Sequence, residues 1–195
     1  MTDYRDQIRD YLRIEKEVIE KLDIDAINDA INALVDTQKN GNTVFIFGNG
    51  GSAAAASHMQ NDFNKGLSEY LDKKFSFQCL NDNVATLMAI ANDIGYEDVF
   101  SFQLTGHLKP GDVVVAISGS GNSKNVIKAV EYARSCGNKV IGLSGYDGGK
   151  LKQLSDISLY APVNSMQVTE DIHMIFNHLM IGVLYGSLCG INHLR

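Results

Sequence analysis

Apolar side chains recur at every third or fourth position over the first forty residues of the chain. This period places them on one face of a helix, and the polar segment around Gly41 interrupts it. The pattern predicts two amphipathic helices in an extension of residues 1–40, which we expect to form an oligomer interface. Their apolar positions are Tyr4, Ile8, Leu12, Val18, Ile19 and Leu22, followed by Ile27, Ile31, Leu34 and Val35.

From residue 43 onward the apolar pattern changes to short continuous runs that are rich in β-branched and aromatic residues. Glycine-containing and polar segments separate these runs, as expected between strands and helices. Strands that are apolar at consecutive positions are typical of a parallel sheet covered on both faces by helices. The five predicted strands are residues 43–47, 75–80, 112–117, 139–143 and 157–161.

The segments between and after these strands have the spacing of helices that cross over the sheet. Together they predict an α/β fold, a three-layer doubly wound domain with a five-stranded parallel sheet. We find no internal repeat or flexible linker, so we expect one domain over residues 1–195. The predicted helices are residues 52–64, 84–92, 123–135 and 168–188, with a short helical turn at 150–154.

Composition and charge narrow the classes of function. The chain has 195 residues, of which 45% are apolar, and 17 basic against 23 acidic residues give a net charge of −6. This charge disfavours binding to nucleic acid. The first helix is too charged for a signal peptide and the apolar run 179–188 is too short for a bilayer, so we expect no membrane association. Cys79, Cys136 and Cys189 have no metal-binding spacing and are expected to be reduced, buried thiols of a cytoplasmic protein.

Two strands end in loops of small residues that lead directly into helices. Residues 47–53 read FGNGGSA, and residues 117–123 read ISGSGNS. The first N–H groups of a helix lack partners and carry partial positive charge, so such loops favour an anion, and glycine allows it to approach closely. Hydroxyls of Ser118, Ser120 and Ser123 add uncharged donors. The two loops therefore predict a phosphate site.

Two other readings of these loops stay open at this point. Each loop could be a tight turn whose serine caps the following helix. Residues 48–53 also resemble a dinucleotide fingerprint with Ala53 in the last position, but the segment near Tyr70 lacks the strand end and acidic residue that would bind a ribose. Neither loop is a Walker A motif. The serine content favours a sugar phosphate over a nucleotide.

The two loops, with residues 91–93 (AND) and 145–149 (GYDGG), resemble the sugar isomerase (SIS) fold and specifically the phosphoheptose isomerase family. The resemblance extends over nearly the whole chain. It implies conversion of sedoheptulose 7-phosphate into D-glycero-D-manno-heptose 7-phosphate, the first step of nucleotide-activated heptose biosynthesis. It also implies a homotetramer with active sites between subunits, and one zinc ion in each site.

The resemblance assigns roles to individual residues of this chain. Asp62 and His178 fall on catalytic positions, and His58, Asp62, Glu170 and His178 on metal-binding positions. The chain departs from the family pattern at three places, because Asp62 stands where Glu is usual, Glu170 where Gln is usual and Gly119 where Thr is usual. The substrate-binding set is Asn49, Gly50, Gly51, Ser52, Asn92, Asp93, Ser118, Gly119, Ser120, Ser123 and Glu170.

Helical spacing supports part of this assignment. His58 and Asp62 are four residues apart and share a helix face, so their tips can approach each other or one ion. Glu170 and His178 are separated by about 12 Å of helical rise, too far for one ion on a continuous helix, and His173 competes as a partner for Glu170. Isomerisation moves a proton between neighbouring carbons, for which we favour Asp62 and His178 as the acid–base pair.

Two rival functions remain on the sequence alone. A protein of the SIS fold can be a non-catalytic scaffold of the replication-initiator-associating type, which would not need His58, Asp62 and His178. The chain could also isomerise a different phosphosugar, since Asp62, Gly119 and Glu170 depart from the pattern. A plain structural reading of His58 is a surface histidine that pairs with Asp62.

Overall fold

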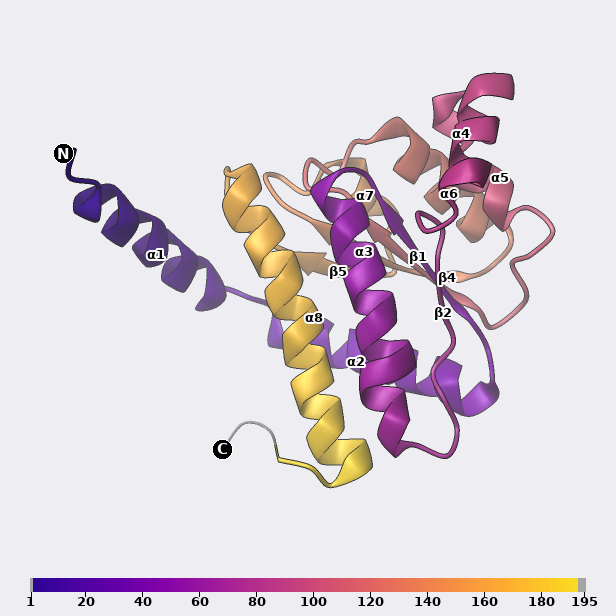
Figure 1. The fold of residues 1–195 in the computed structure, drawn as a ribbon, viewed down its shortest axis with the longest axis horizontal. Helices are drawn as coiled ribbons and strands as arrows, with labels where there is room; N and C mark the ends of the chain where they lie inside the picture. The colour runs from indigo at the N-terminus through magenta and orange to yellow at the C-terminus, as the bar shows by residue number, and fades with distance from the viewer. Residues whose placement is uncertain (1, 193–195) are drawn as a thin grey trace.

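The computed structural model describes residues 2–192. Its centre is a five-stranded sheet in the order β2-β1-β3-β4-β5, with every neighbouring pair parallel (Figure 1). Val44 of β1 lies opposite Phe77 of β2 and Val113 of β3, which fixes the register at the centre of the sheet. The predicted parallel sheet is confirmed. The strands are β1 Val44–Gly48, β2 Phe77–Cys79, β3 Val113–Ile117, β4 Lys139–Ser144 and β5 Ile157–Tyr160.

The predicted helices are present in the predicted order, but the structure adds the unpredicted 3₁₀-helices at Leu67–Tyr70 and Tyr96–Asp98 and differs in further details. The helix predicted over residues 52–64 is α-helical only to Asn61 and continues as a π-helix. The short helix at Ser101–Leu104 was not predicted, and β2 is shorter than predicted. The helices are α1 Arg5–Ile19, α2 Ile24–Asn40, α3 Gly51–Asn61, π-helix η1 Asp62–Gly66, 3₁₀-helix η2 Leu67–Tyr70, α4 Val84–Asp93, 3₁₀-helix η3 Tyr96–Asp98, α5 Ser101–Leu104, α6 Lys124–Ser135, α7 Gly149–Leu154 and α8 Met166–Cys189.

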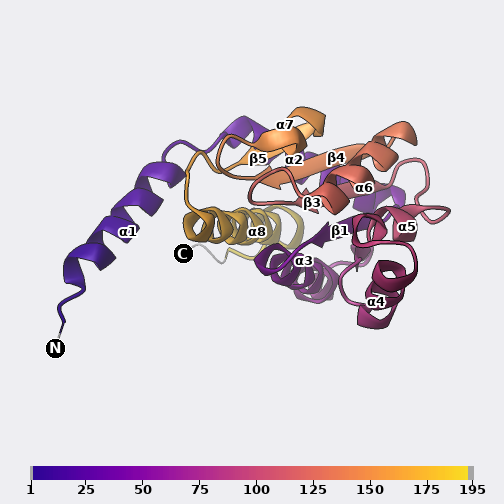
Figure 2. The same cartoon turned by 90° about the horizontal axis from the view of Figure 1, so that it is seen from above.

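Helices cover both faces of the sheet, so the domain has the predicted three layers (Figure 2). Side chains along a strand alternate between faces. Val44 and Ile46 of β1 pack with α2, α3 and α8, whereas Phe45 and Phe47 pack with α4, α5 and α6. The loops that follow β1 and β3 therefore open at the carboxyl ends of adjacent strands, where ligands bind in folds of this kind.

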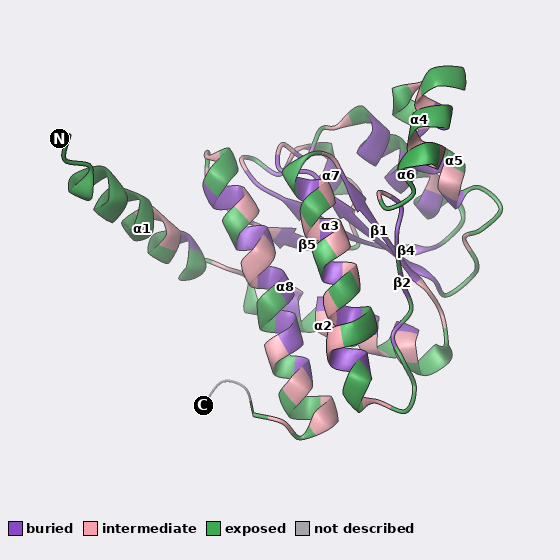
Figure 3. Ribbon diagram, viewed as in Figure 1, coloured by how far each residue is buried: buried purple, intermediate pink, exposed green. Residues whose placement is uncertain are grey.

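The two N-terminal helices differ in how they are packed. α1 projects from the body of the molecule and is exposed along most of its length (Figures 1 and 3). It contacts the rest of the chain through buried Val18 and through the Tyr11 hydroxyl, which donates to Asp171 on α8. α2 lies in the core, capped by the Asp23 side chain and ended by Gly41 in a left-handed conformation.

α8 is a core helix, although its length and apolar composition alone would suit a membrane span. Its buried side chains pack with α2, α3 and the sheet, as the sequence predicted for a buried helix. Cys79 is buried as expected, but the prediction is wrong for Cys136, which is exposed, and Cys189, which is half-buried. Both stand at helix ends, where packing is incomplete.

Candidate active site

Hydrogen bonds from neighbouring elements hold the first loop, residues 48–52, in a fixed shape. The side chain of Asn81 accepts from the Gly48 N–H at 3.1 Å and donates to the Gly48 carbonyl at 2.8 Å. Asn49 and Asn125 exchange amide hydrogen bonds of 2.8 and 2.9 Å, and the Tyr96 hydroxyl donates to Asn49. Asn49 therefore orients the loop and has little hydrogen-bonding capacity left for a ligand.

A carboxylate already lies against the start of α3. Gly50 caps this helix with φ 56° and ψ −122°, a conformation open to glycine. A Cβ atom at the next residue, Gly51, would come within 2.4 Å of Oε1 of Glu170, so the glycine makes room for this carboxylate. The negative charge of Glu170 therefore lies at the positive end of α3.

The second loop, residues 118–123, presents hydroxyl groups beside the start of α6. Ser118 is buried, and its hydroxyl donates to the Ser123 hydroxyl at 3.1 Å. Ser123 caps α6, but its side chain makes no hydrogen bond to the first turn, where the Val126 N–H donates instead to Oδ1 of Asn125 at 2.9 Å. The Ser120 hydroxyl lies at the same loop and lines a cavity of about 610 Å³. These donors and the dipole of α6 suit a phosphate.

Met166 occupies the space above Gly119 in this second loop. A Cβ at Gly119 would come within 2.6 Å of the Met166 sulfur and 3.3 Å of its methyl group. Met166 also lines the cavity that contains Ser120, Asn122 and Tyr146. The missing side chain at residue 119 and the thioether at residue 166 are therefore complementary.

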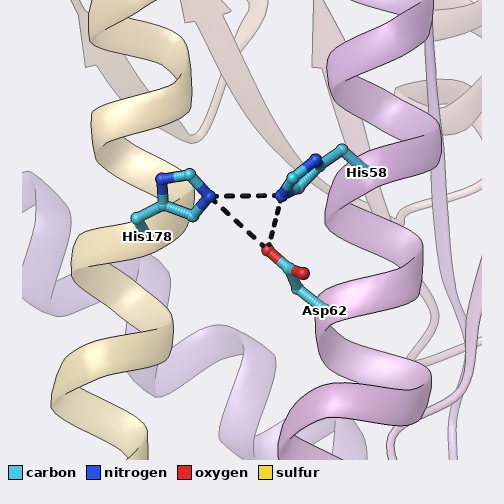
Figure 4. Close-up of side chains that lie close together, drawn as sticks. All are labelled: His58, Asp62 and His178. Carbon is cyan, nitrogen blue, oxygen red and sulfur yellow. Dashed lines mark hydrogen bonds and ion pairs between the residues drawn. The ribbon is translucent and has the colours of Figure 1, made fainter. Parts of the chain in front are cut away.

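Three side chains, from α3, the first residue of η1 and α8, converge on one point (Figure 4). Nε2 of His58 on α3 lies 3.1 Å from Oδ2 of Asp62 and 3.2 Å from Nε2 of His178 on α8. The same Oδ2 lies 3.9 Å from Nε2 of His178. The two histidines are about half exposed and Asp62 is mostly covered, so a small molecule can reach the cluster.

The main chain changes its helical form at Asp62. This residue ends α3 and begins the π-helix η1. π-helical turns widen the helix locally and occur frequently at functional sites. The Asp62 carboxylate accepts a hydrogen bond of 2.6 Å from Nδ2 of Asn177, a buried residue of α8.

His173 lies between the loops and the cluster, and it is buried and unpartnered. It lines a cavity of about 300 Å³ between α3 and α8, together with Gly51, His58 and Glu170. Among residues 2–192, neither of its ring nitrogens has a hydrogen-bond partner, so it is not the partner of Glu170 that the sequence allowed. Burial lowers the pKa of His173 to about 4 and outweighs the opposite effect of the Ser144 backbone.

The structure places the predicted site residues in several groups. Of the four predicted metal ligands, His58, Asp62 and His178 form one group, while Glu170 lies at the start of α3, about two helical turns from His178 along α8. Asn92 and Asp93 end α4 on the other face of the sheet, where the Asn92 amide donates to Asp93 at 2.7 Å. Both are exposed, and neither lines the cavity between α3 and α8.

Sequence reasoning missed several residues that shape the site. Asn177 and Met166 belong to the last helix, and Asn81, Tyr96 and Asn125 hold the first loop. Asn177 carries a signal that could have been used, because it is an amide at a core position of an apolar helix, directly before His178. The others depend on contacts between distant segments.

The donor set of the cluster fits a divalent cation such as zinc. Two imidazole nitrogens and one carboxylate oxygen are ordinary zinc ligands, and three protein ligands leave a fourth position open, as in catalytic sites. Ligands about 2.1 Å from a tetrahedral ion lie about 3.4 Å apart. The three distances of 3.1, 3.2 and 3.9 Å bracket this value.

Comparison with known proteins places the chain in a family. A model of the SIS domain matches residues 3–145. Phosphoheptose isomerase of Rhodospirillum rubrum is 38% identical over 84% of this chain and 87% of its own length, and that of Helicobacter hepaticus is 41% identical over 86% and 84%. The structure of the phosphoheptose isomerase from Neisseria gonorrhoeae superposes with a TM-score of 0.84 at 31% identity, covering 92% of this chain and 95% of that one. The enzyme from Francisella tularensis superposes with a TM-score of 0.86 at 27% identity, covering 94% and 98%. The chain belongs to the phosphoheptose isomerase family of SIS-domain proteins.

Proposed function

We propose that the chain is an aldose–ketose isomerase that converts sedoheptulose 7-phosphate into D-glycero-D-manno-heptose 7-phosphate. The observation that carries this proposal is the convergence of His58, Asp62 and His178 from α3, η1 and α8, with His58 lining one cavity together with Gly51 and Ser52 of the first loop. Relatives named phosphoheptose isomerase support the choice of substrate. The reaction would begin the biosynthesis of nucleotide-activated heptose in the cytoplasm.

The loop at residues 118–123 would bind the phosphate, and the first loop would bind the sugar. Ser118, Ser120 and Ser123 would donate to the phosphate oxygens, with the dipole of α6 behind them. Gly50, Gly51 and Ser52 would contact sugar hydroxyls beside Glu170. The exposed Asn92 and Asp93 would serve a site completed by a neighbouring subunit.

Asp62 and His178 would move the protons of the reaction. A carboxylate can take the proton from the carbon beside the carbonyl, and an imidazole can return one to its neighbour. Within residues 2–192, the hydrogen bond and ion pairs of the Asp62 carboxylate end on Oδ2, so Oδ1 is the oxygen available to a proton. The resulting enediolate carries negative charge, which hydrogen-bond donors of the site would stabilise.

Nε2 of His58, Oδ2 of Asp62 and Nε2 of His178 would hold one zinc ion. Bound there, the ion supplies a Lewis acid that polarises the oxygens of the substrate. Glu170 would orient the sugar from the start of α3.

The chain would act as one domain in a homotetramer with active sites between subunits. The exposed apolar residues of α1 support an interface there, because few side chains of this helix are buried against the rest of its own chain. The half-exposed histidines support a site that a second subunit completes.

Turnover of a panel of sugars tests the proposal. Purified protein with its metal content measured is incubated with sedoheptulose 7-phosphate, a six-carbon ketose phosphate and sedoheptulose without phosphate, and the products are followed by NMR. We expect the aldose heptose phosphate from the first compound and far slower or no turnover of the others. Preferred turnover of the six-carbon compound would assign a different substrate, and no turnover of any would favour a scaffold.

A further inference from the structure

Asn177 stands out as a buried amide that contacts the cluster without belonging to it. Its side chain is on the core face of α8, with 2% of the residue exposed, directly before His178. Its Nδ2 donates to Oδ2 of Asp62 at 2.6 Å, across the seam between α8 and the end of α3. The same oxygen faces both histidines.

The chemistry of the two groups fixes the direction of this hydrogen bond. An ionised carboxylate only accepts, so the amide must turn its NH₂ group toward Asp62. Oδ1 of Asn177 then points into the core, where it has no partner among the described residues. A buried acceptor without a partner costs stability, and an apolar side chain would avoid that cost. The hydrogen bond to Asp62 is therefore the interaction that explains an amide, and not an apolar side chain, at this buried position.

Asn177 also limits the movement of Asp62. The Asp62 carboxylate is on a short side chain at the change from α-helix to π-helix, and its ion pair with His58 joins it only to the turn that precedes it. The bond from Asn177 ties it to α8, beside the histidine with which it must act. The carboxylate is thereby fixed between two imidazoles that come from different helices.

We propose that Asn177 is a positioning residue that holds the Asp62 carboxylate between His58 and His178 and so sets the affinity of the cluster for a divalent cation. The inference deepens the proposed function and rests on it for the identity of the site. Outer partners of metal ligands typically change affinity 10–100-fold when removed. Removing the Asn177 side chain would also displace the Asp62 carboxylate and so lower kcat. KM for the sugar phosphate would change little, because it depends on the two loops, which Asn177 does not contact.

Cobalt binding by the full chain tests this role without relying on turnover. Co²⁺ takes the same ligands as zinc and absorbs visible light when bound. Metal-free wild type, Asn177→Leu and Asn177→Ala are titrated with Co²⁺, so that one variant serves if the other does not fold, and circular dichroism checks each fold. Asn138→Leu is the matched control, because Asn138 is a buried amide that donates to backbone carbonyls of Lys109 and Asp112 at the amino ends of β3 and β4, outside the cluster.

We expect both Asn177 variants to bind Co²⁺ 10–100-fold more weakly than wild type, with Asn138→Leu within twofold of wild type. We also expect kcat on sedoheptulose 7-phosphate to fall while KM stays within twofold. Equal Co²⁺ affinity in the Asn177 variants and wild type would overturn the inference, as would a wild type that binds no Co²⁺. Failure of the proposed function looks different, because the wild type would then bind Co²⁺ but turn over no ketose phosphate.

Discussion

Each departure of this chain from the family pattern is accompanied by a specific contact of the residue concerned. Asp62 accepts a hydrogen bond from buried Asn177, and the Glu170 carboxylate lies in the space left by Gly51. Met166 fills the position that a side chain at Gly119 would occupy. The three departures are therefore accommodated locally.

The contact between residues 119 and 166 makes a prediction about packing. Gly119→Thr places a Cβ atom 2.6 Å from the Met166 sulfur, which must move to make room, and the backbone at residue 119 does not have the positive φ that would disfavour threonine. We expect the variant to lose about 1–3 kcal/mol of unfolding free energy, as overpacked sites do. Urea denaturation of Gly119→Thr, Met166→Ala and the double variant measures the coupling.

If the two residues compete for the same space, the double variant is more stable than the sum of the single changes predicts. Additive effects would show that Met166 does not limit the size of residue 119.

Burial of His173 makes a prediction about pH. Its pKa is lowered to about 4, below the value near 6.5 of an unfolded histidine. Between these values the unfolded chain takes up a proton that the folded chain does not, so this histidine reduces stability as pH falls from 6.5 to 4. The reduction is about 3 kcal/mol by pH 4.

Urea denaturation of wild type and His173→Leu at pH 7 and pH 4.5 isolates this effect, since other groups titrate alike in both proteins. We expect wild type to lose more stability than the variant over this interval. An equal loss in the two proteins would mean that His173 is protonated within the fold.

At the scale of elements, the sequence predicted most strands and helices because their side chains are buried in simple periods. The consecutive apolar residues of β3 are buried on both faces of the sheet. The buried apolar residues of α8 pack against one of these faces. The π-helix at Asp62 could not be predicted, because its five residues contain one buried apolar side chain, Phe63, which is too few to show a period. The four-residue α5 is too short to show a period.

The contact between Glu170 and the start of α3 makes a prediction about this pair of helices. Glu170→Gln keeps the size of the side chain and removes the charge that complements the helix dipole. We expect it to lower the unfolding free energy by about 0.3–1 kcal/mol in low salt, and by less in 0.5 M salt. Thermal or urea denaturation at two salt concentrations measures it. A loss that does not change with salt would argue against an electrostatic contact.

At the scale of the whole molecule, the order of strands and phosphate-type loops in the chain was sufficient to predict the fold class. The site was only partly predictable. Spacing showed that His58 and Asp62 share a helix face, but His178 is 120 residues from His58, and only the packing of α8 beside α3 brings them together. The resemblance to the family, and not the local sequence pattern, therefore predicted that His178 belongs with His58 and Asp62.

Exposed apolar residues on the projecting α1 make a prediction about assembly. Ile8 is 56% and Leu12 is 59% exposed, although both lie on the apolar side of the helix. We expect Ile8→Glu with Leu12→Glu to dissociate the proposed tetramer while circular dichroism stays unchanged, with light scattering as the measurement. Arg9→Glu, on the charged side of α1, serves as the control. A wild type that is monomeric would contradict the proposed assembly.

The most direct test of the account is the incorporation of solvent deuterium during turnover of sedoheptulose 7-phosphate in D₂O, followed by NMR. Wild type is compared with Asp62→Asn and His178→Ala, and with His107→Ala, a histidine outside the cluster, as the control. The account predicts deuterium at the carbon beside the carbonyl with wild type and His107→Ala, and a loss of at least about a hundredfold in rate with the other two. Exchange that continues unchanged in Asp62→Asn and His178→Ala would contradict the assignment of proton transfer to this cluster.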